Sequence, residues 1–105
     1  MKHANEKNLK RVSLELGGKS PLIIMDDVTL DDYVMNTVNQ ALFFNKGECC
    51  AAASRIFVHE KKYDEFIEKS LKLAKSAVLG DPLLNTTTQG PQISEKQRDK
   101  VMSYI

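Results

Sequence analysis

Residues 22–25 (Leu-Ile-Ile-Met) form an unbroken apolar run, and this run constrains the fold more than any other part of the sequence. A short run of this kind is typical of a strand buried on both faces, as in the parallel sheets of α/β proteins. It is followed by an amphipathic stretch and then by a second short apolar run within residues 55–59. This order predicts a strand–helix–strand unit and an α/β fold.

The amphipathic stretch between the two runs predicts a helix. Apolar residues recur at spacings of three and four, which gives one apolar stripe along a helix. Thr29 and Asp32 have the spacing of a capping box, so we expect the helix to begin at Leu30. It should end near Asn45, where Asn-Lys-Gly interrupts the pattern.

Two further helices are predicted toward the C-terminus. Helical spacing of apolar residues extends over residues 62–78, and a glycine and a proline at positions 80 and 82 supply a stop. Ser94 and Gln97 form another capping box, which predicts a helix that starts near Glu95. We expect this last helix to be still running at Ile105.

Upstream of the first apolar run, residues 12–16 alternate between apolar and polar side chains. The apolar positions share one parity while Glu15 lies on the other, which predicts a strand with one buried face and Glu15 near its end. Gly17 and Gly18 should stop this strand and leave main-chain groups open to a ligand. In α/β folds, ligands tend to bind at the carboxyl ends of strands.

The overall composition excludes several classes of protein. Fifteen basic and 14 acidic residues give a net charge of +1, so no strong field would attract nucleic acid or an anionic membrane. The apolar runs are too short to cross a bilayer, and the first residues do not resemble a signal peptide. We therefore expect neither a nucleic-acid nor a membrane partner, and a cytoplasmic location, with the mitochondrial matrix as the alternative.

Both cysteines, Cys49 and Cys50, lie side by side between Gly47 and three alanines. Neighbouring cysteines do not form an ordinary structural disulfide, and neither His3 nor His59 has zinc-ligand spacing to them, so no metal site is expected. A cysteine in a loop of small residues can be a nucleophile, although free cysteines are commonly buried as small hydrophobic residues. Local reasoning does not choose between the two thiols, and a redox switch remains a third interpretation.

Residues 18–20 (Gly-Lys-Ser) match the tail of a phosphate-binding P-loop, but the match is partial. A P-loop needs another glycine at position 13, where this chain has serine, and a helix at once, where it has Pro21 and an apolar run. Glu15 on its own is most simply a solvated surface residue. Its place next to the glycines makes it a candidate base.

Two motifs together resemble the NAD(P)-dependent aldehyde dehydrogenase family. Residues 15–21 (Glu-Leu-Gly-Gly-Lys-Ser-Pro) look like the family's glutamate motif, and residues 44–50 (Phe-Asn-Lys-Gly-Glu-Cys-Cys) look like its cysteine motif. They occur in the family's order and at nearly its spacing. The likeness continues through residues 54–58, 63–66 and 89–92 and is greatest to the branch that oxidises acetaldehyde or retinal, together with the dehydrogenase domain of formyltetrahydrofolate dehydrogenase.

The resemblance implies a role for each matching residue. Cys50 matches the family's nucleophile and Glu15 the general base that activates water. Leu16 and Gly17 match positions against the nicotinamide end of the cofactor, which would be NAD or NADP. The implied reaction oxidises an aldehyde to a carboxylic acid through a thiohemiacetal and a thioester on the cysteine.

The remaining implications concern the substrate path and the whole protein. Phe44 and Cys49 match positions that line the aldehyde tunnel. Residues 1–18 would be the last strand of the coenzyme-binding domain, and residues 19–105 the N-terminal part of a Rossmann-like catalytic domain. We expect the chain to be an incomplete, inactive fragment of a homo-oligomeric enzyme. The alternative is a truncated remnant that acts as a binding or structural module.

Overall fold

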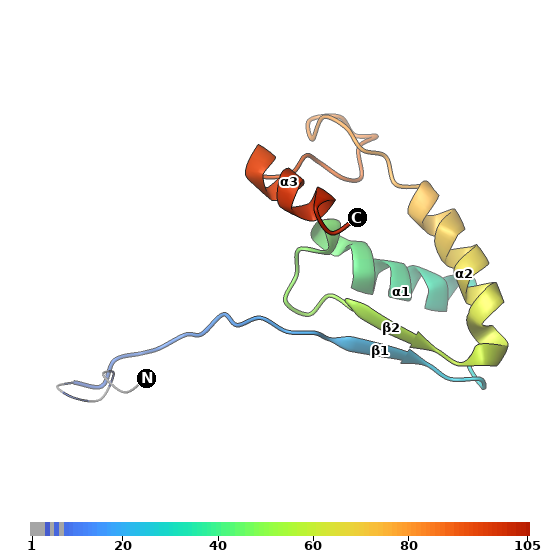
Figure 1. The fold of residues 1–105 in the computed structure, drawn as a ribbon, viewed down its shortest axis with the longest axis horizontal. Helices are drawn as coiled ribbons and strands as arrows, with labels where there is room; N and C mark the ends of the chain where they lie inside the picture. The colour runs from blue at the N-terminus through green and yellow to red at the C-terminus, as the bar shows by residue number, and fades with distance from the viewer. Residues whose placement is uncertain (1–3, 5, 7) are drawn as a thin grey trace.

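The computed structural model describes residues 4, 6 and 8–105. Strands β1 and β2 pair in parallel, with Pro21 opposite Arg55 and Ile24 opposite Val58, and α1 connects them (Figure 1). This confirms the predicted strand–helix–strand unit and the α/β class. The elements in chain order are β1 (Pro21–Ile24), α1 (Asp32–Phe43), η2 (Phe44–Gly47), β2 (Arg55–Val58), α2 (Glu60–Lys75) and α3 (Glu95–Met102).

Helix α1 begins at Asp32, two residues later than predicted. Asp31 is its N-cap, and the Asp31 carboxylate accepts a hydrogen bond from the N–H of Val34 at 2.9 Å. The predicted capping box of Thr29 and Asp32 is therefore wrong, because the neighbouring aspartate supplies the cap. Leu30 does not start the helix but packs into the core, where it is 1% exposed.

Helix α2 begins two residues before the predicted start and ends at Lys75, three residues before the predicted end. His59 caps its N-terminus, where Nδ1 accepts a hydrogen bond from the N–H of Lys61 at 3.3 Å. The Ser76 hydroxyl donates to the carbonyl of Leu73 at 2.6 Å at the other end. The helix thus ends through local hydrogen bonds, before the glycine and proline are reached.

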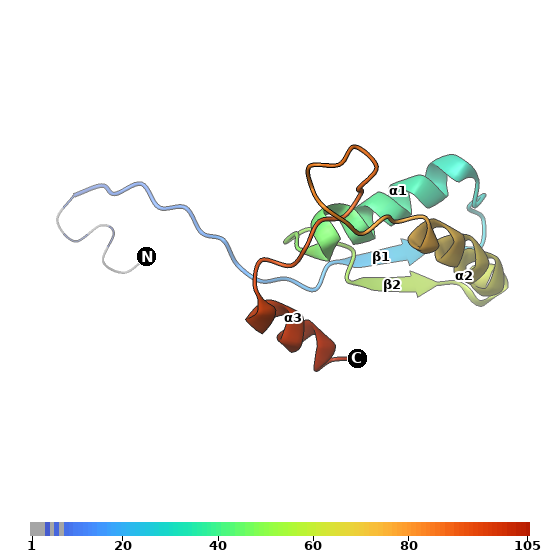
Figure 2. The ribbon, with the colours of Figure 1, turned by 90° about the horizontal axis from the view of Figure 1, so that it is seen from above.

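Helix α3 begins at Glu95, as predicted from the capping box. The Ser94 hydroxyl accepts a hydrogen bond from the N–H of Gln97 at 3.2 Å, which confirms this N-cap. The helix ends at Met102 rather than running to the last residue, because Ser103 forms a C-cap with backbone bonds to earlier carbonyls. Its polar sequence buries no side chain, and Figure 2 shows it apart from α1 and α2.

The hydrophobic core lies between the two long helices and one face of the sheet. Its buried side chains are Ile24, Leu30, Met35, Val38 and Phe66. On the other face Ile23, Met25 and Phe57 are more than half exposed. The prediction that residues 22–25 are buried on both faces is wrong, because the helices cover only one face (Figure 1).

The predicted strand over residues 12–16 is absent from the structure, which has no regular element between residues 9 and 20. Figure 1 shows this segment as an extended arm that leads away from the sheet. Its apolar residues Val12, Leu14 and Leu16 are all exposed. The alternation is real, but a strand needs hydrogen bonds from a neighbour, and no other described segment pairs with the arm.

The chain leaves an unusually large surface uncovered. Its accessible surface is 9167 Å², whereas a compact monomer of 11.8 kDa exposes about 5,900 Å². The radius of gyration is 18.5 Å, against about 13 Å for a compact domain of this length. A chain of this length would be expected to bury roughly two-thirds of the surface of its unfolded form, and this chain buries less. None of the helices in the described residues is long and apolar enough to cross a membrane.

Lys69 ties α2 to the loop before α1. Its ammonium donates to the carbonyl of Leu30 and, at 2.7 Å, to the carboxylate of Glu65 one turn earlier in the helix. The hydrogen bond from Lys69 lowers the pKa of the Glu65 carboxyl. This contact holds the backbone of Leu30 in place next to the core that its side chain fills.

Replacing Leu30 with alanine should destabilise the fold by about 2–5 kcal/mol, because it removes a fully buried side chain and leaves a cavity. Urea denaturation followed by circular dichroism measures the change. Leu83→Ala is the matched control, since Leu83 is 88% exposed and should change stability by less than about 0.5 kcal/mol. Equal losses in the two variants would contradict the assigned core.

Candidate active site

The glutamate and cysteine motifs meet at one end of the pair of strands. Because β1 and β2 are parallel and in register, the residues that precede them emerge side by side. Residues 15–20 lead into β1, and residues 48–54 lead into β2. The two segments therefore meet at the amino end of the strand pair. In α/β folds, ligands usually bind at the opposite, carboxyl end.

Direct contacts connect the two segments. The Ser20 hydroxyl donates to the carbonyl of Cys50 at 3.5 Å, and a Cβ placed on Gly18 would lie 3.5 Å from the same oxygen. The guanidinium of Arg55 donates to the carbonyl of Lys19 from Nε at 3.0 Å and from Nη2 at 2.7 Å. The end of the glutamate motif therefore lies against the backbone of the cysteine.

A left-handed turn leads from α1 to the cysteines. Asn45, Lys46 and Gly47 have φ angles of 49°, 62° and 75°, and two of these residues are not glycine. Such angles are uncommon outside glycine, asparagine and aspartate. The Asn45 amide donates to the carbonyl of Glu48 at 3.3 Å, and Lys46 pairs with the Glu48 carboxylate at 3.5 Å. The helix was predicted to end near Asn45, and the left-handed turn begins there.

The cysteines themselves lie on a second turn. The N–H of Ala52 donates to the carbonyl of Cys49 at 3.0 Å. The N–H of Ala53 donates to the carbonyl of Ala41 in α1 at 2.9 Å, and Ala53 is 5% exposed. A larger side chain at position 53 would not fit against the helix end. The loop is thus anchored just after the turn, and the turn presents its side chains outward.

Both thiols are free and exposed in this turn. The interpretation of Cys49 and Cys50 as small buried hydrophobic residues is therefore wrong. No group of three or more histidine, cysteine or carboxylate side chains in the described part of the chain could hold a metal ion. His3, one of the histidines considered as a ligand, lies outside the described residues.

The P-loop interpretation fails on the element that follows the glycines. A phosphate-binding loop of that type leads directly into a helix, whose N–H groups face the phosphate. Here Gly18 and Ser20 lead into β1, which begins at Pro21. No helix N-terminus lies at this point, so the lysine and serine have another role.

The other predicted site residues lie in the arm and in η2. Glu15, Leu16 and Gly17 belong to the extended arm just before the contact with the cysteine turn, and all are exposed. No atom lies within 4 Å of the position where a Cβ on Gly17 would be. Phe44 begins η2 and is 64% exposed. No hydrogen bond among the described residues joins Glu15 to Cys50.

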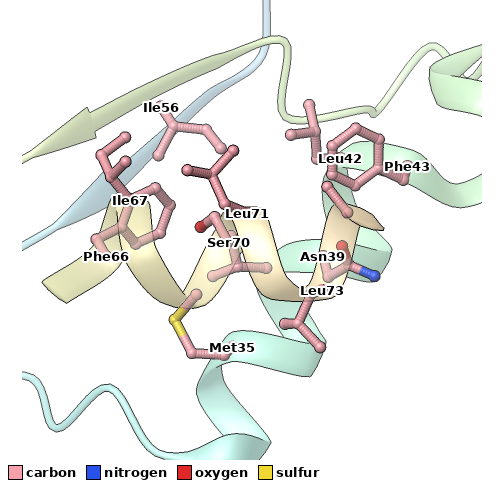
Figure 3. A pocket seen from close by; sticks show the side chains of 12 residues that line it. Met35, Asn39, Leu42, Phe43, Ile56, Phe66, Ile67, Ser70, Leu71 and Leu73 are labelled. Atoms are coloured by element: carbon pink, nitrogen blue, oxygen red, sulfur yellow. The ribbon is translucent and has the colours of Figure 1, made fainter. Parts of the chain in front are cut away.

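Two cavities accompany these elements. One of about 630 Å³ lies behind the left-handed turn and is lined by Phe44, Asn45 and Lys46 together with residues from the end of α2 and from residues 79–90. An apolar cavity of about 210 Å³ lies between α1, β2 and α2 (Figure 3). The side chains of Asn39 and Ser70 are its only polar ones, and it contains none of the predicted site residues. The second cavity is therefore not the candidate site.

Sequence reasoning missed Ser20 and Arg55, which connect the two motifs. Ser20 precedes β1 and Arg55 is the first residue of β2, and the contacts of both follow once these two predicted strands are paired in parallel register. The signal that could have found them is therefore the pairing of the predicted strands.

Comparisons with known proteins give the family. The sequence model of the aldehyde dehydrogenase family matches residues 1–105. The mitochondrial aldehyde dehydrogenase of Homo sapiens is 54% identical over 102 residues, which are 97% of this chain and 20% of that protein. Retinal dehydrogenase 2 of Taeniopygia guttata is 53% identical over the same share. The chain belongs to the aldehyde dehydrogenase family, and it spans about a fifth of the length of these relatives.

Solved structures agree with the fold. The NAD⁺ complex of an aldehyde dehydrogenase from Bacillus cereus matches 91% of this chain with a TM-score of 0.82 and 41% identity, over 19% of its own length. Gamma-glutamyl-gamma-aminobutyraldehyde dehydrogenase from Burkholderia cenocepacia matches 99% of this chain with a TM-score of 0.84 and 42% identity, over 21% of its length. The structure is therefore an incomplete part of the aldehyde dehydrogenase fold, as predicted.

Gly47→Ala should destabilise the protein by about 1–2 kcal/mol, because alanine resists a φ of +75° and its Cβ would lie 3.2 Å from the Leu42 carbonyl oxygen. Urea denaturation measures the loss. Gly17→Ala is the control, since open space surrounds Gly17, and should change stability by less than about 0.5 kcal/mol. An unchanged stability in Gly47→Ala would show that the left-handed turn is not required.

Proposed function

We propose that this protein, in its full-length form, oxidises an aldehyde to a carboxylic acid with NAD or NADP as the hydride acceptor. The observation that carries the proposal is the contact between the two motifs, in which Gly18 and Ser20 lie against the backbone of Cys50. Membership of the aldehyde dehydrogenase family supports it, as do relatives that are named for aldehyde and retinal oxidation.

The dinucleotide fits the arm at Leu16 and Gly17. Gly17 has open space beside its backbone, and Leu16 is 72% exposed, so a flat ring can approach both. The bound cofactor supplies an acceptor for the hydride. The solved NAD⁺ complex of the similar aldehyde dehydrogenase from Bacillus cereus supports NAD, and NADP is the alternative.

Cys50 is the proposed nucleophile. Its thiolate adds to the carbonyl carbon of the aldehyde and forms a thiohemiacetal oxyanion. As the carbonyl re-forms, the C–H bond breaks and its electron pair leaves as hydride, which converts the adduct into a thioester. Phe44 and Cys49 line the approach of the aldehyde, and both are exposed next to the turn.

Glu15 is the proposed base for the second half of the reaction. Its carboxylate removes a proton from water, and the hydroxide adds to the thioester carbonyl. Collapse of this intermediate breaks the C–S bond, releases the carboxylic acid and returns the Cys50 thiolate. Glu15 precedes Gly18 by three residues in an extended segment, and Gly18 lies beside the Cys50 carbonyl, so the backbone of Glu15 is within about 10 Å of chain length from that point.

The same proposal assigns the domains. Residues 1–18 belong to the coenzyme-binding domain as its last strand, and residues 19–105 form the N-terminal part of the catalytic domain. The exposed Val12, Leu14 and Leu16 support this, because elements packed on one face of a sheet would cover them. We further propose a homo-oligomer, which acts on small aldehydes and not on nucleic acid or membranes. Its compartment is the cytoplasm or, as the names of some relatives favour, the mitochondrial matrix.

Cys50→Ser should lower kcat for aldehyde oxidation by at least about a thousandfold, because a neutral serine hydroxyl is a far weaker nucleophile than a thiolate. The assay follows NADH absorbance with the full-length protein. Cys49→Ser is the matched control and should retain activity within about tenfold, because Cys49 only lines the substrate path.

Equal losses in the two cysteine variants would contradict the assignment of Cys50. A full-length wild-type protein that neither forms NADH nor binds NAD in calorimetry would overturn the proposed function and support the alternative of a non-catalytic binding or structural module.

A further inference from the structure

We propose that Arg55 is a positioning residue that holds the Glu15 segment in register with the cysteine turn. The inference rests on the proposed function, in which Glu15 acts on the thioester of Cys50. Arg55 does not touch the reacting atoms. It follows Cys50 by five residues and binds the backbone four residues after Glu15.

The contact with Lys19 uses two donors of the same guanidinium. Nε and Nη2 both donate to the Lys19 carbonyl, at 3.0 and 2.7 Å. Hydrogen bonds from a charged donor are stronger than neutral ones, and the planar fork fixes the direction of the carbonyl. A lysine ammonium has no such fork. The arm is therefore held by this side chain at the point where it enters β1.

Arg55 is itself held from the other side. Its guanidinium lies over the ring of Phe57, two residues further along β2, at 5.7 Å from the centroid. The Ser20 hydroxyl bonds the Cys50 carbonyl at 3.5 Å, so the chain from Cys50 to Arg55 and the pair Lys19–Ser20 form a closed ring of contacts. This ring of contacts includes the backbone of Cys50 but not Glu15. The position of Glu15 depends on the ring because Glu15 lies in the arm that the ring holds.

This arrangement predicts which half of the reaction depends on Arg55. Thioester formation needs Cys50 and the cofactor, whereas thioester hydrolysis also needs Glu15 at the correct distance. A displacement of about 1 Å in a positioned group can cost about a hundredfold in rate. Leu16 and Gly17 belong to the same arm but only lie beside the cofactor, whereas Glu15 must reach the attacking water. Loss of the Arg55 contact should therefore slow hydrolysis more than hydride transfer.

The test uses the full-length protein and three variants. Arg55→Met removes both hydrogen bonds, and Arg55→Lys keeps the charge but not the fork. Arg98→Met is the control, because within the described residues the Arg98 side chain forms its hydrogen bonds with Glu95 and Asp99 of its own helix. Single-turnover experiments measure NADH formation and acid release separately.

We expect acid release to fall about 10- to 100-fold in Arg55→Met, and NADH formation to fall by a smaller factor. Acid release in Arg55→Lys should be slower than in wild type but faster than in Arg55→Met, and Arg98→Met should match wild type. Adding Arg55→Met to Glu15→Gln should slow acid release no further, because the arginine acts through the glutamate. Equal slowing of both half-reactions in Arg55→Met, or slowing of neither, would overturn the proposal.

Hydrogen exchange supplies a readout that is independent of activity. Arg55→Met should increase exchange in the peptide that covers residues 15–20 and leave α1 and α2 unchanged. Unchanged exchange in residues 15–20 would overturn the proposed link even if the enzyme is active. A wild-type protein without NADH formation would instead overturn the proposed function, while hydrogen exchange would still decide whether Arg55 holds the arm.

Discussion

The parallel pairing of β1 and β2 is the interaction on which the rest of the structure depends. It places Pro21 opposite Arg55, and it brings the segments that precede the strands to the same edge. The glutamate motif and the cysteine motif are separated by more than twenty residues in the sequence. Through this register, the Ser20 hydroxyl donates to the Cys50 carbonyl, Gly18 lies beside that carbonyl, and Arg55 binds Lys19. A shift of one residue would reverse the face of every strand side chain and break these contacts.

Much of the fold follows from local chemistry, and the errors occur where distant contacts decide. The strand–helix–strand unit and the cap at Ser94 were predictable from residue spacing. The start of α1 was not, because Thr29 and Asp31 are both acceptable caps and the burial of Leu30 selects the second. Likewise, the alternation over residues 12–16 predicts a strand, but strand formation requires a partner that the described residues do not supply.

The candidate site, like the fold, was predictable from the sequence only in part. Cys50 and Glu15 were identified from motifs whose order and spacing resemble one family, and membership of that family is confirmed. Their roles remain proposals. The contacts that tie the motifs together do not follow from local residue spacing, since Arg55 and Lys19 are 36 positions apart and meet only through the pairing of the two strands. Nor does residue type predict the left-handed turn at Lys46, because lysine rarely adopts a positive φ and does so here beside a glycine with the same sign.

The most direct test of the account is to trap the thioester. Full-length Glu15→Gln is mixed with a simple aliphatic aldehyde and NAD, quenched in acid and mapped by mass spectrometry. Because the nucleophile is intact and the base is missing, the account predicts that the acyl group accumulates on Cys50 and that wild type shows far less of it. An acyl group on Cys49, or none in a Glu15→Gln protein that still releases acid at the wild-type rate, would contradict the account.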